Sequence, residues 1–289
     1  MTEGAALPYQ GVLAVLASMH GKECVIAPVL QQSLGLRVVL AEGLDTDRFG
    51  TFSLEIARTG SQLEAARAKI SAAFNADPTA RVGVASEGSF GPHPLIPFLP
   101  FGRELVVLID RVTGFELIGQ DTGPHTNFSH RIVANIDEAN VFAERSGFPE
   151  HGLIVIGCVD GQPAPACVLI KDITDALALQ TAIRETLSVC GSAFIETDMR
   201  AHRNPTRMVA IERATRDLAR RFMSRCPACD FRGFDLTERI AGLPCDWCGG
   251  PTNAIRQHVL QCAACGHREE RCVTTSATAD PGQCDFCNP

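Results

Sequence analysis

The chain has 289 residues, of which 45% are hydrophobic and 20% charged, a composition typical of a soluble globular protein with one large and one small domain. Its formal net charge of −7 argues against a protein that coats nucleic acid or anionic membranes. Its apolar runs, such as residues 12–17, are too short to cross a bilayer, and residues 1–10 lack a signal-peptide pattern, so we expect a cytoplasmic protein without a membrane partner.

The first 100 residues alternate between strand and helix patterns. Short apolar runs predict strands at 11–18, 36–40 and 81–85, and helical spacing predicts helices at 22–34 and 61–74. Ser61 and Glu64 have the spacing of a capping box, which supports a helix start at that point. After the third strand, residues 86–91 are expected to form a glycine-rich turn, and four prolines between 92 and 100 indicate an extended loop.

The pattern continues through the middle of the chain. Further strands are predicted at 105–110, 131–136, 153–156, 167–171 and 193–196, and further helices at 138–146, 174–189 and about 205–224. Pro205 suits the first turn of the last helix. The alternation predicts an α/β domain over residues 11–225, with one mixed or mostly parallel sheet covered by helices.

Nine of the thirteen cysteines fall in the last 64 residues. Eight of them form Cys-x-x-Cys pairs separated by 15 residues and then by 18, the spacing of four-cysteine zinc ribbons: Cys226/Cys229, Cys245/Cys248, Cys262/Cys265 and Cys284/Cys287. We predict a zinc-ribbon module over residues 226–289, in which the first two pairs hold one structural zinc ion and the last two pairs a second. An interleaved pairing, first with third and second with fourth, stays open, as does an iron–sulfur site; Cys272 is left over as a thiol.

The module is acidic, which bears on its partners. Residues 226–289 contain eight Asp and Glu against five Arg and no Lys, and zinc-bound thiolates add negative charge, so binding to nucleic acid is not expected. Stabilising the fold or contacting another protein is the expected role. Eight arginines between residues 200 and 225 are the footprint that a nucleic-acid binder would use, but Asp198, Glu212 and Asp217 dilute them.

Four segments of the large domain resemble the inosine triphosphate pyrophosphatase superfamily, enzymes that hydrolyse non-standard nucleoside triphosphates. They are residues 16–22, 62–69, 82–88 and 199–203, and their order and rough spacing agree with the superfamily. The chain departs from it at Ser86-Glu87, where the superfamily has two acids, and at Met19-His20, where it has Thr-Asn. The whole chain also resembles an uncharacterised bacterial domain family with a zinc-ribbon tail, which implies no activity.

The resemblance implies an inosine triphosphate pyrophosphatase-like fold and a set of site residues. It implies a phosphate-binding Lys22, a metal-binding Glu64 with a basic Lys69 on the same helix, a catalytic Glu87, and nucleotide contacts from His202 and Arg203. Hydrolysis of a phosphoanhydride needs Mg²⁺ on carboxylates, cations on the phosphates and a base that orients water. We therefore assign Glu64 and Glu87 to the metal, and assign to the nucleotide Lys22, Lys69, Arg200, His202 and Arg203, and we expect Lys22, Glu87 and His202-Arg203 to share one cleft.

Several of these residues have a structural explanation as well. Glu64 fits a helix cap equally well, Lys69 fits a solvated surface, and His202-Arg203 fits a helix boundary. Asp45 and Asp47 are interpreted as loop-forming residues, with metal binding as the alternative, and Glu196 and Asp198 form another candidate acid pair. The sequence thus predicts a Mg²⁺-dependent nucleotide phosphohydrolase or a nucleotide-binding protein with a structural zinc tail. The alternative is a non-catalytic protein that uses the zinc module as an interaction surface.

Overall fold

The structure is a computed structural model that describes residues 7–46, 60–273 and 276–288. The chain divides into two compact units, residues 1–219 and 220–289, and the domain boundary predicted after residue 225 lies a few residues beyond this division. In the described part of the chain, no helix has both the length and the apolar character that crossing a bilayer would require.

A five-stranded mixed sheet forms one half of the first unit. Its strand order is β2-β1-β3-β4-β5, with bounds β1 (Leu13–Ala17), β2 (Arg37–Leu40), β3 (Val82–Pro92), β4 (Pro100–Asp110) and β5 (Phe115–Gly123). β1 pairs in parallel with β2 and β3, whereas β3, β4 and β5 form an antiparallel meander. The last pair between β1 and β3 is Ala17 with Ala85, so β3 continues to Pro92 after β1 has ended.

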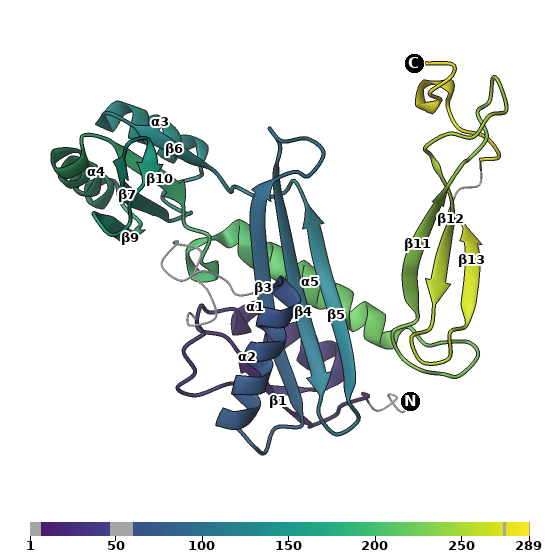
Figure 1. The fold of residues 1–289 in the computed structure, drawn as a ribbon. Coiled ribbons are helices and arrows are strands. Elements are labelled where there is room, and N and C mark those ends of the chain that lie inside the picture. Colours follow the sequence, from purple (N-terminus) through teal and green to yellow (C-terminus); the bar gives the residue numbers. More distant parts are fainter. Residues whose placement is uncertain (1–6, 47–59, 274–275, 289) are drawn as a thin grey trace, which may run out of the picture. The chain divides into compact units, whose positions relative to one another are not determined.

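Helices cover both faces of this sheet (Figure 1). α1 (Glu23–Leu34) follows β1, and α2 (Gln62–Ala76) begins at the predicted capping box of Ser61 and Glu64. α2 lies so close to β3 that a Cβ at Gly83 would come within 2.4 Å of Ile70. α5 (Pro205–Met223) lies on the other face, where a Cβ at Gly119 of β5 would meet the α5 backbone at 2.2 Å. Glycine at these two positions allows both helices to approach the sheet.

A second, antiparallel sheet forms the other half of the first unit (Figure 1). Its order is β6-β10-β7-β8, with β9 also paired to β7, and its bounds are β6 (His130–Val133), β7 (Leu153–Val159), β8 (Gln162–Pro163), β9 (Leu169–Ile173) and β10 (Ala193–Thr197). α3 (Ile136–Arg145) and α4 (Ala176–Cys190) pack on it around Phe142, Leu153 and Ile183. A 3₁₀ turn, η2 (Ala201–Arg203), joins β10 to α5.

The observed fold corrects the sequence prediction in three places. There are separate sheets in the first unit, not one. The glycine-rich turn predicted at 86–91 is wrong, because β3 continues through these residues, paired with β4 as far as Pro92 opposite Pro100. Strand β5 was not predicted, because Phe115–Gly123 mixes polar and apolar residues without clear alternation. The other predicted strands and all five predicted helices are present within a few residues.

The second unit is an antiparallel three-stranded sheet with cysteine pairs at both ends. Its strands are β11 (Asp235–Ala241), β12 (Ile255–Gln261) and β13 (Arg268–Cys272), and a short 3₁₀ turn, η3 (Pro281–Gln283), follows them. The chain enters β11 and leaves β12 at one end of the sheet, because Asp235 pairs with Gln261. At the opposite end, Ala241 pairs with Ile255.

Candidate functional site

The candidate site lies where β1 ends and β3 continues, on that side, without a neighbouring strand among the described residues. After Ala17 the chain turns through residues 18–21 and enters α1, which places Lys22 beside β3. Lys22 Nζ donates a hydrogen bond to the carbonyl of Ser86 at 3.3 Å, and its side chain is buried. From α2, Gln62 Nε2 donates to the carbonyl of Glu87 at 3.3 Å. Lys22 therefore reaches the edge of β3 that β1 leaves, whereas Gln62, which also donates to the carbonyl of Arg103 at 3.1 Å, lies over the junction of β3 and β4.

Two buried ion pairs flank this position, one on each face of the sheet. Glu87 points toward α2 and pairs with Lys69. Gly88, the next residue, lies on the other face opposite Glu104 of β4, and there Arg207 Nε of α5 donates to Glu104 Oε1 at 2.5 Å. A Cβ at Gly88 would come within 2.6 Å of Glu104 and 2.7 Å of Arg207, so glycine at this position leaves room for the pair.

The charge balance of this group favours an anionic ligand. The charges that act on Lys22 come from Arg207, Glu87, Lys69 and Glu104. Burial, with the charge of Arg207 adding to it, lowers the pKa of Lys22 from 10.5 to about 7, although the carboxylate of Glu87 opposes this shift. With Lys22 protonated, the group carries three positive and two negative charges. We name these five residues the Lys22 cluster.

Two buried hydroxyls adjoin the Lys22 cluster. Ser18 follows β1 directly, and the pairing of Ala17 with Ala85 places it next to Ser86 of β3. Both side chains are buried, and within the described residues neither Oγ atom has a hydrogen-bond partner. A buried polar group without a partner costs free energy. The oxygen atoms of a phosphate could accept hydrogen bonds from both hydroxyls and remove that cost.

A second group of charged residues lies around η2. The rings of His20 and His202 are stacked with centroids 4.9 Å apart, which connects η2 to the turn that precedes Lys22. Arg203 Nε donates to Asp172 at 2.7 Å, and Arg200 contacts both Asp172 and the buried Asp198. Burial lowers the pKa of His202, and the neighbouring Arg200 and Arg203 lower it further. His202 is therefore mostly neutral near pH 7, while both arginines are held by acids.

The predicted site residues thus fall into three sets: those in the Lys22 cluster, those around η2, and Glu64. The structure brings Lys22, Lys69 and Glu87 together, and it stacks His202 on His20, which precedes Lys22 by two residues. Arg200 and Arg203 lie in the η2 group, bound to Asp172. Lys69 is buried in an ion pair and not solvated, and His202 and Arg203 each make a specific side-chain contact at the helix boundary.

Within the described part of the chain, the hydrogen bonds of the exposed Glu64 carboxylate are those of a helix cap: it accepts from Ser61 N at 2.7 Å and from Ser61 Oγ at 2.9 Å. These hydrogen bonds lower its pKa. Of the other acids considered, Asp47 lies outside the described residues. Asp198 binds Arg200, and burial, with the charge of Asp198 adding to it, raises the pKa of Glu196 to about 7.

Sequence reasoning missed Glu104 and Arg207. Glu104 is an acid at the start of the apolar run of β4, and an acid in such a run indicates a buried charge that needs a partner. Arg207 was one of eight arginines in a stretch interpreted as solvated surface, and nothing local separates it from the others. Its partner lies 103 residues away, so only the fold shows that it is buried.

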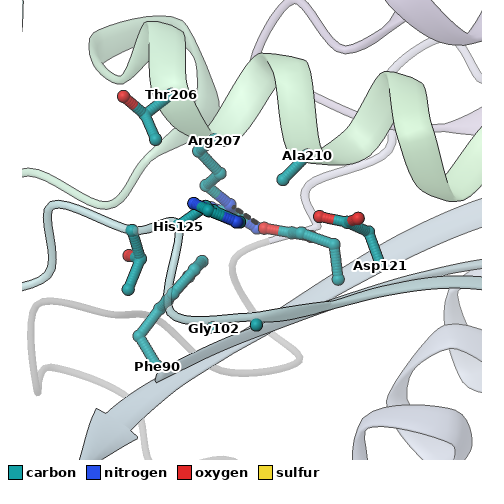
Figure 2. Close-up of a pocket in the computed structure, with 10 residues that line it drawn as sticks. Phe90, Gly102, Asp121, His125, Thr206, Arg207 and Ala210 are labelled. Carbon is teal, nitrogen blue, oxygen red and sulfur yellow. Dashed lines mark hydrogen bonds and ion pairs between the residues drawn. The ribbon is translucent and has the colours of Figure 1, made fainter. Parts of the chain in front are cut away.

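Two hollows adjoin the Arg207 side of the sheet. The first, lined by Phe90, Asp121, His125 and Arg207 (Figure 2), measures about 20 Å³, which is room for roughly one water molecule. The second measures about 520 Å³, the size of a small-molecule pocket, and is lined in part by Phe98, Phe128 and His130. A row of stacked rings connects the two, because Arg207 lies over Phe90 at 5.3 Å and Phe90 stacks on Phe128 at 6.4 Å.

The second unit contains two four-cysteine groups with the geometry of a tetrahedral metal site. One consists of Cys226, Cys229, Cys262 and Cys265, and the other of Cys245, Cys248, Cys284 and Cys287. Sulfur atoms within the groups lie 3.7–3.8 Å apart. Zn–S bonds of about 2.3 Å in a tetrahedron separate the sulfurs by about 3.8 Å. The spacing therefore fits one zinc ion in each group.

The pairing of the cysteines corrects the sequence prediction. We expected neighbouring pairs to share an ion, but the structure shows the interleaved arrangement, first pair with third and second with fourth. The antiparallel pairing of β11 with β12 is the reason. It brings the residues before β11 to those after β12, at the end of the sheet where Asp235 meets Gln261. Cys272 belongs to neither group and is exposed.

These features describe an α/β protein with a buried charged cluster and a tail of two interleaved four-cysteine sites. The chain belongs to the family described as a domain of unknown function, DUF6671, which matches residues 70–289. The matched region includes Glu87, Glu104, Arg207 and all eight paired cysteines, and it begins after Lys22 and Lys69. A comparison with curated proteins found no match.

Proposed function

We propose that the first unit binds a nucleotide or a similar phosphorylated small molecule at the Lys22 cluster and hydrolyses it with Mg²⁺. The observation that carries this proposal is the charge of the cluster: with Lys22 protonated, three buried cations and two buried acids lie around the part of β3 that extends beyond β1. A phosphate group would compensate the excess positive charge and accept hydrogen bonds from Ser18 and Ser86. The N-terminus of α1, which begins just after Lys22, adds a favourable dipole for an anion.

The acids of the cluster suit the chemistry that such a ligand needs. In the inosine triphosphate pyrophosphatase superfamily, which the turn at Lys22 and the segment at Glu87 resemble, two acids stand where this chain has Ser86-Glu87. Glu104 is a second buried acid near that position, supplied by β4 instead of β3. This supports a distant relation to that fold, with the second carboxylate relocated to the neighbouring strand.

Magnesium would be held mainly by the substrate. Among the described residues, only the two four-cysteine groups bring three or more metal-ligating side chains together. Mg²⁺ commonly keeps several water ligands and is bound through one or two carboxylates and the substrate phosphates. Glu87 is the carboxylate that we assign to this role. A phosphate that attracts Lys69 would compete with its ion pair and release Glu87 toward the metal or the attacking water.

A panel of standard and deaminated nucleoside triphosphates with Mg²⁺, assayed for release of phosphate and pyrophosphate, tests the proposal. We expect turnover of at least one of them and a rise in melting temperature on adding nucleotide. The alternative, a binding protein without activity, is favoured by the ion pair that already neutralises Glu87. It predicts a thermal shift without release of product. If no triphosphate gave either a thermal shift or release of product, both proposals would be contradicted.

A further inference from the structure

The two four-cysteine groups differ in the residues that their cysteine turns carry. In the group next to the start of β11, the residues between the cysteines are Pro227-Ala228 and Ala263-Ala264. In the group at the opposite end of the sheet, they are Asp246-Trp247 and Asp285-Phe286. Both turns of this second group therefore have an acid followed by a large aromatic residue. We call residues 242–254 and 276–288, which surround this group, the distal tip.

The aromatic side chains of the distal tip are exposed. The fraction of surface accessible to solvent is 75% for Trp247 and 85% for Phe286. Trp247 is the single tryptophan of the chain, and Trp is seldom left this exposed without a binding role. The other cysteine group has the opposite character, because Phe234 is buried against Cys226 and Cys262. Trp247 and Phe286, in contrast, bury little of their apolar surface within the module.

The distal tip is also negatively charged. Its two segments contain three acids, Asp246, Asp280 and Asp285, and no Lys, Arg or His. Four thiolates around one Zn²⁺ add a formal charge of about −2. Asp246 accepts from Thr278 at 2.9 Å, and Asp285 accepts from Asn253 at 3.2 Å, which holds each carboxylate beside its aromatic neighbour. Arg256, the arginine nearest in sequence, donates to Gln257 on β12.

We propose that the distal tip docks a basic segment of a partner protein, with an arginine or lysine of that segment stacked on Trp247 and paired with Asp246 or Asp285. Trp is the most favourable aromatic partner for a cation, and exposed carboxylates beside it attract the same charge. Phe286 supplies apolar contact for the stem of the basic side chain. A nucleic acid would bring phosphates to this negative surface and be repelled.

Trp247 makes the proposal testable in the full-length, zinc-loaded protein, because it is the one source of tryptophan fluorescence. The probes are an arginine-rich peptide, a glutamate-rich peptide of equal length and a single-stranded oligodeoxynucleotide. We expect a saturable fluorescence change with the arginine peptide alone. A response to the oligonucleotide, or none to the arginine peptide, would overturn the proposal.

Variants separate a built site from general charge attraction. Phe286→Ala, and Asp246→Asn combined with Asp285→Asn, should each weaken binding of the arginine peptide by about threefold or more. Asp230→Asn is the matched control, since it removes one exposed charge at the other end of the module and Asn tolerates the positive φ of 59° at that position. Equal weakening by Asp230→Asn would overturn the proposal.

Two further measurements check that the variants are folded and that the partner is not a second copy of the chain. The zinc content of each variant must stay at about two ions per chain, which shows that the module is still folded. The molar mass in solution, measured by light scattering, should be that of a monomer or should not change on Trp247→Ala. A dimer that Trp247→Ala dissociates would show that the tip binds a second copy of the chain and would contradict the proposed partner.

Discussion

The guanidinium of Arg207 and the carboxylate of Glu104 form an ion pair of 2.5 Å in which each side chain is only 1% exposed. Arg207 also donates to the carbonyl of Met199, and its guanidinium lies over the ring of Phe90. The pair therefore connects α5, the β3–β4 ribbon and the segment before η2. Removing one partner of a buried pair leaves a charge without compensation, which is far more costly than losing an exposed pair.

We expect Glu104→Gln to lower the free energy of unfolding by about 3 kcal/mol, measured by urea denaturation. The matched control is Glu116→Gln, which breaks an ion pair with Arg67 whose side chain is 48% exposed. An exposed pair contributes at most about 1 kcal/mol, so the control should change little. Similar losses from both variants would show that the Glu104 pair is no more important to stability than a surface contact.

Lys22 should make the stability of the ligand-free protein depend on pH. Burial lowers its pKa in the folded state to about 7, from 10.5. Between these values the unfolded chain binds a proton that the folded chain does not, so the contribution of Lys22 to stability rises with pH. Its destabilising effect is fully present below about pH 7 and disappears above about pH 10.5.

Lys22→Met removes this titration and provides the test. The difference in unfolding free energy between variant and wild type should favour the variant near pH 7 and shrink as pH rises toward about 9. A difference that is independent of pH would contradict a lowered pKa. If the variant is more stable yet loses nucleotide binding, the lysine is retained for its ligand and not for the fold.

The zinc sites offer a test of cysteine pairing by metal content. Each four-cysteine group should hold one zinc ion, so a variant that damages one group should keep about one ion per chain. Cys226→Ser combined with Cys262→Ser affects a single group in the interleaved arrangement and should leave one ion. Cys226→Ser combined with Cys245→Ser affects both groups and should leave none. Elemental analysis would give the reverse result if neighbouring pairs shared an ion.

How much the sequence predicted depends on the distance over which each feature forms. The capping box at Ser61 and Glu64 and the start of α5 at Pro205 are local, and both were predicted correctly. The cysteine spacing identified the ligands but not their grouping, because the grouping depends on the pairing of β11 with β12. The intervals of 15 and 18 residues favoured neighbouring pairs, and no residue in the turns indicates the interleaved arrangement.

The charged cluster shows the same limit. Lys22 follows an apolar strand and Glu87 interrupts one, so each position stands out within a single segment of the sequence. Glu104 and Arg207 form their ion pair with each other, and neither segment alone indicates that the other is near. Glu87 was expected in a turn because glycines surround it, whereas Gly88 accommodates the Glu104–Arg207 pair inside a continuous strand. A glycine that makes room for a side chain and one that forms a turn are alike in sequence.

The last prediction separates the roles of two residues in the Lys22 cluster. If Glu87 holds Mg²⁺ or orients the attacking water, Glu87→Gln keeps its shape and removes its charge, and kcat should fall by about 10²-fold or more. Nucleotide affinity should change less, because Lys22, Lys69 and Arg207 remain. Lys22→Ala should do the opposite and mainly weaken binding, because in the proposed complex it removes a cation that contacts the phosphate in both the ground state and the transition state. Asp110→Asn is the control: Asp110 is a buried acid on β4 whose ion pair with Arg81 stabilises the other end of the sheet, and this substitution should leave both kinetic constants nearly unchanged.

Steady-state kinetics with the best substrate of the triphosphate panel, together with equilibrium binding of a non-hydrolysable analogue, would measure both effects. Loss of affinity in Glu87→Gln equal to that in Lys22→Ala would mean that Glu87 serves only to position Lys69, and the catalytic assignment would be wrong.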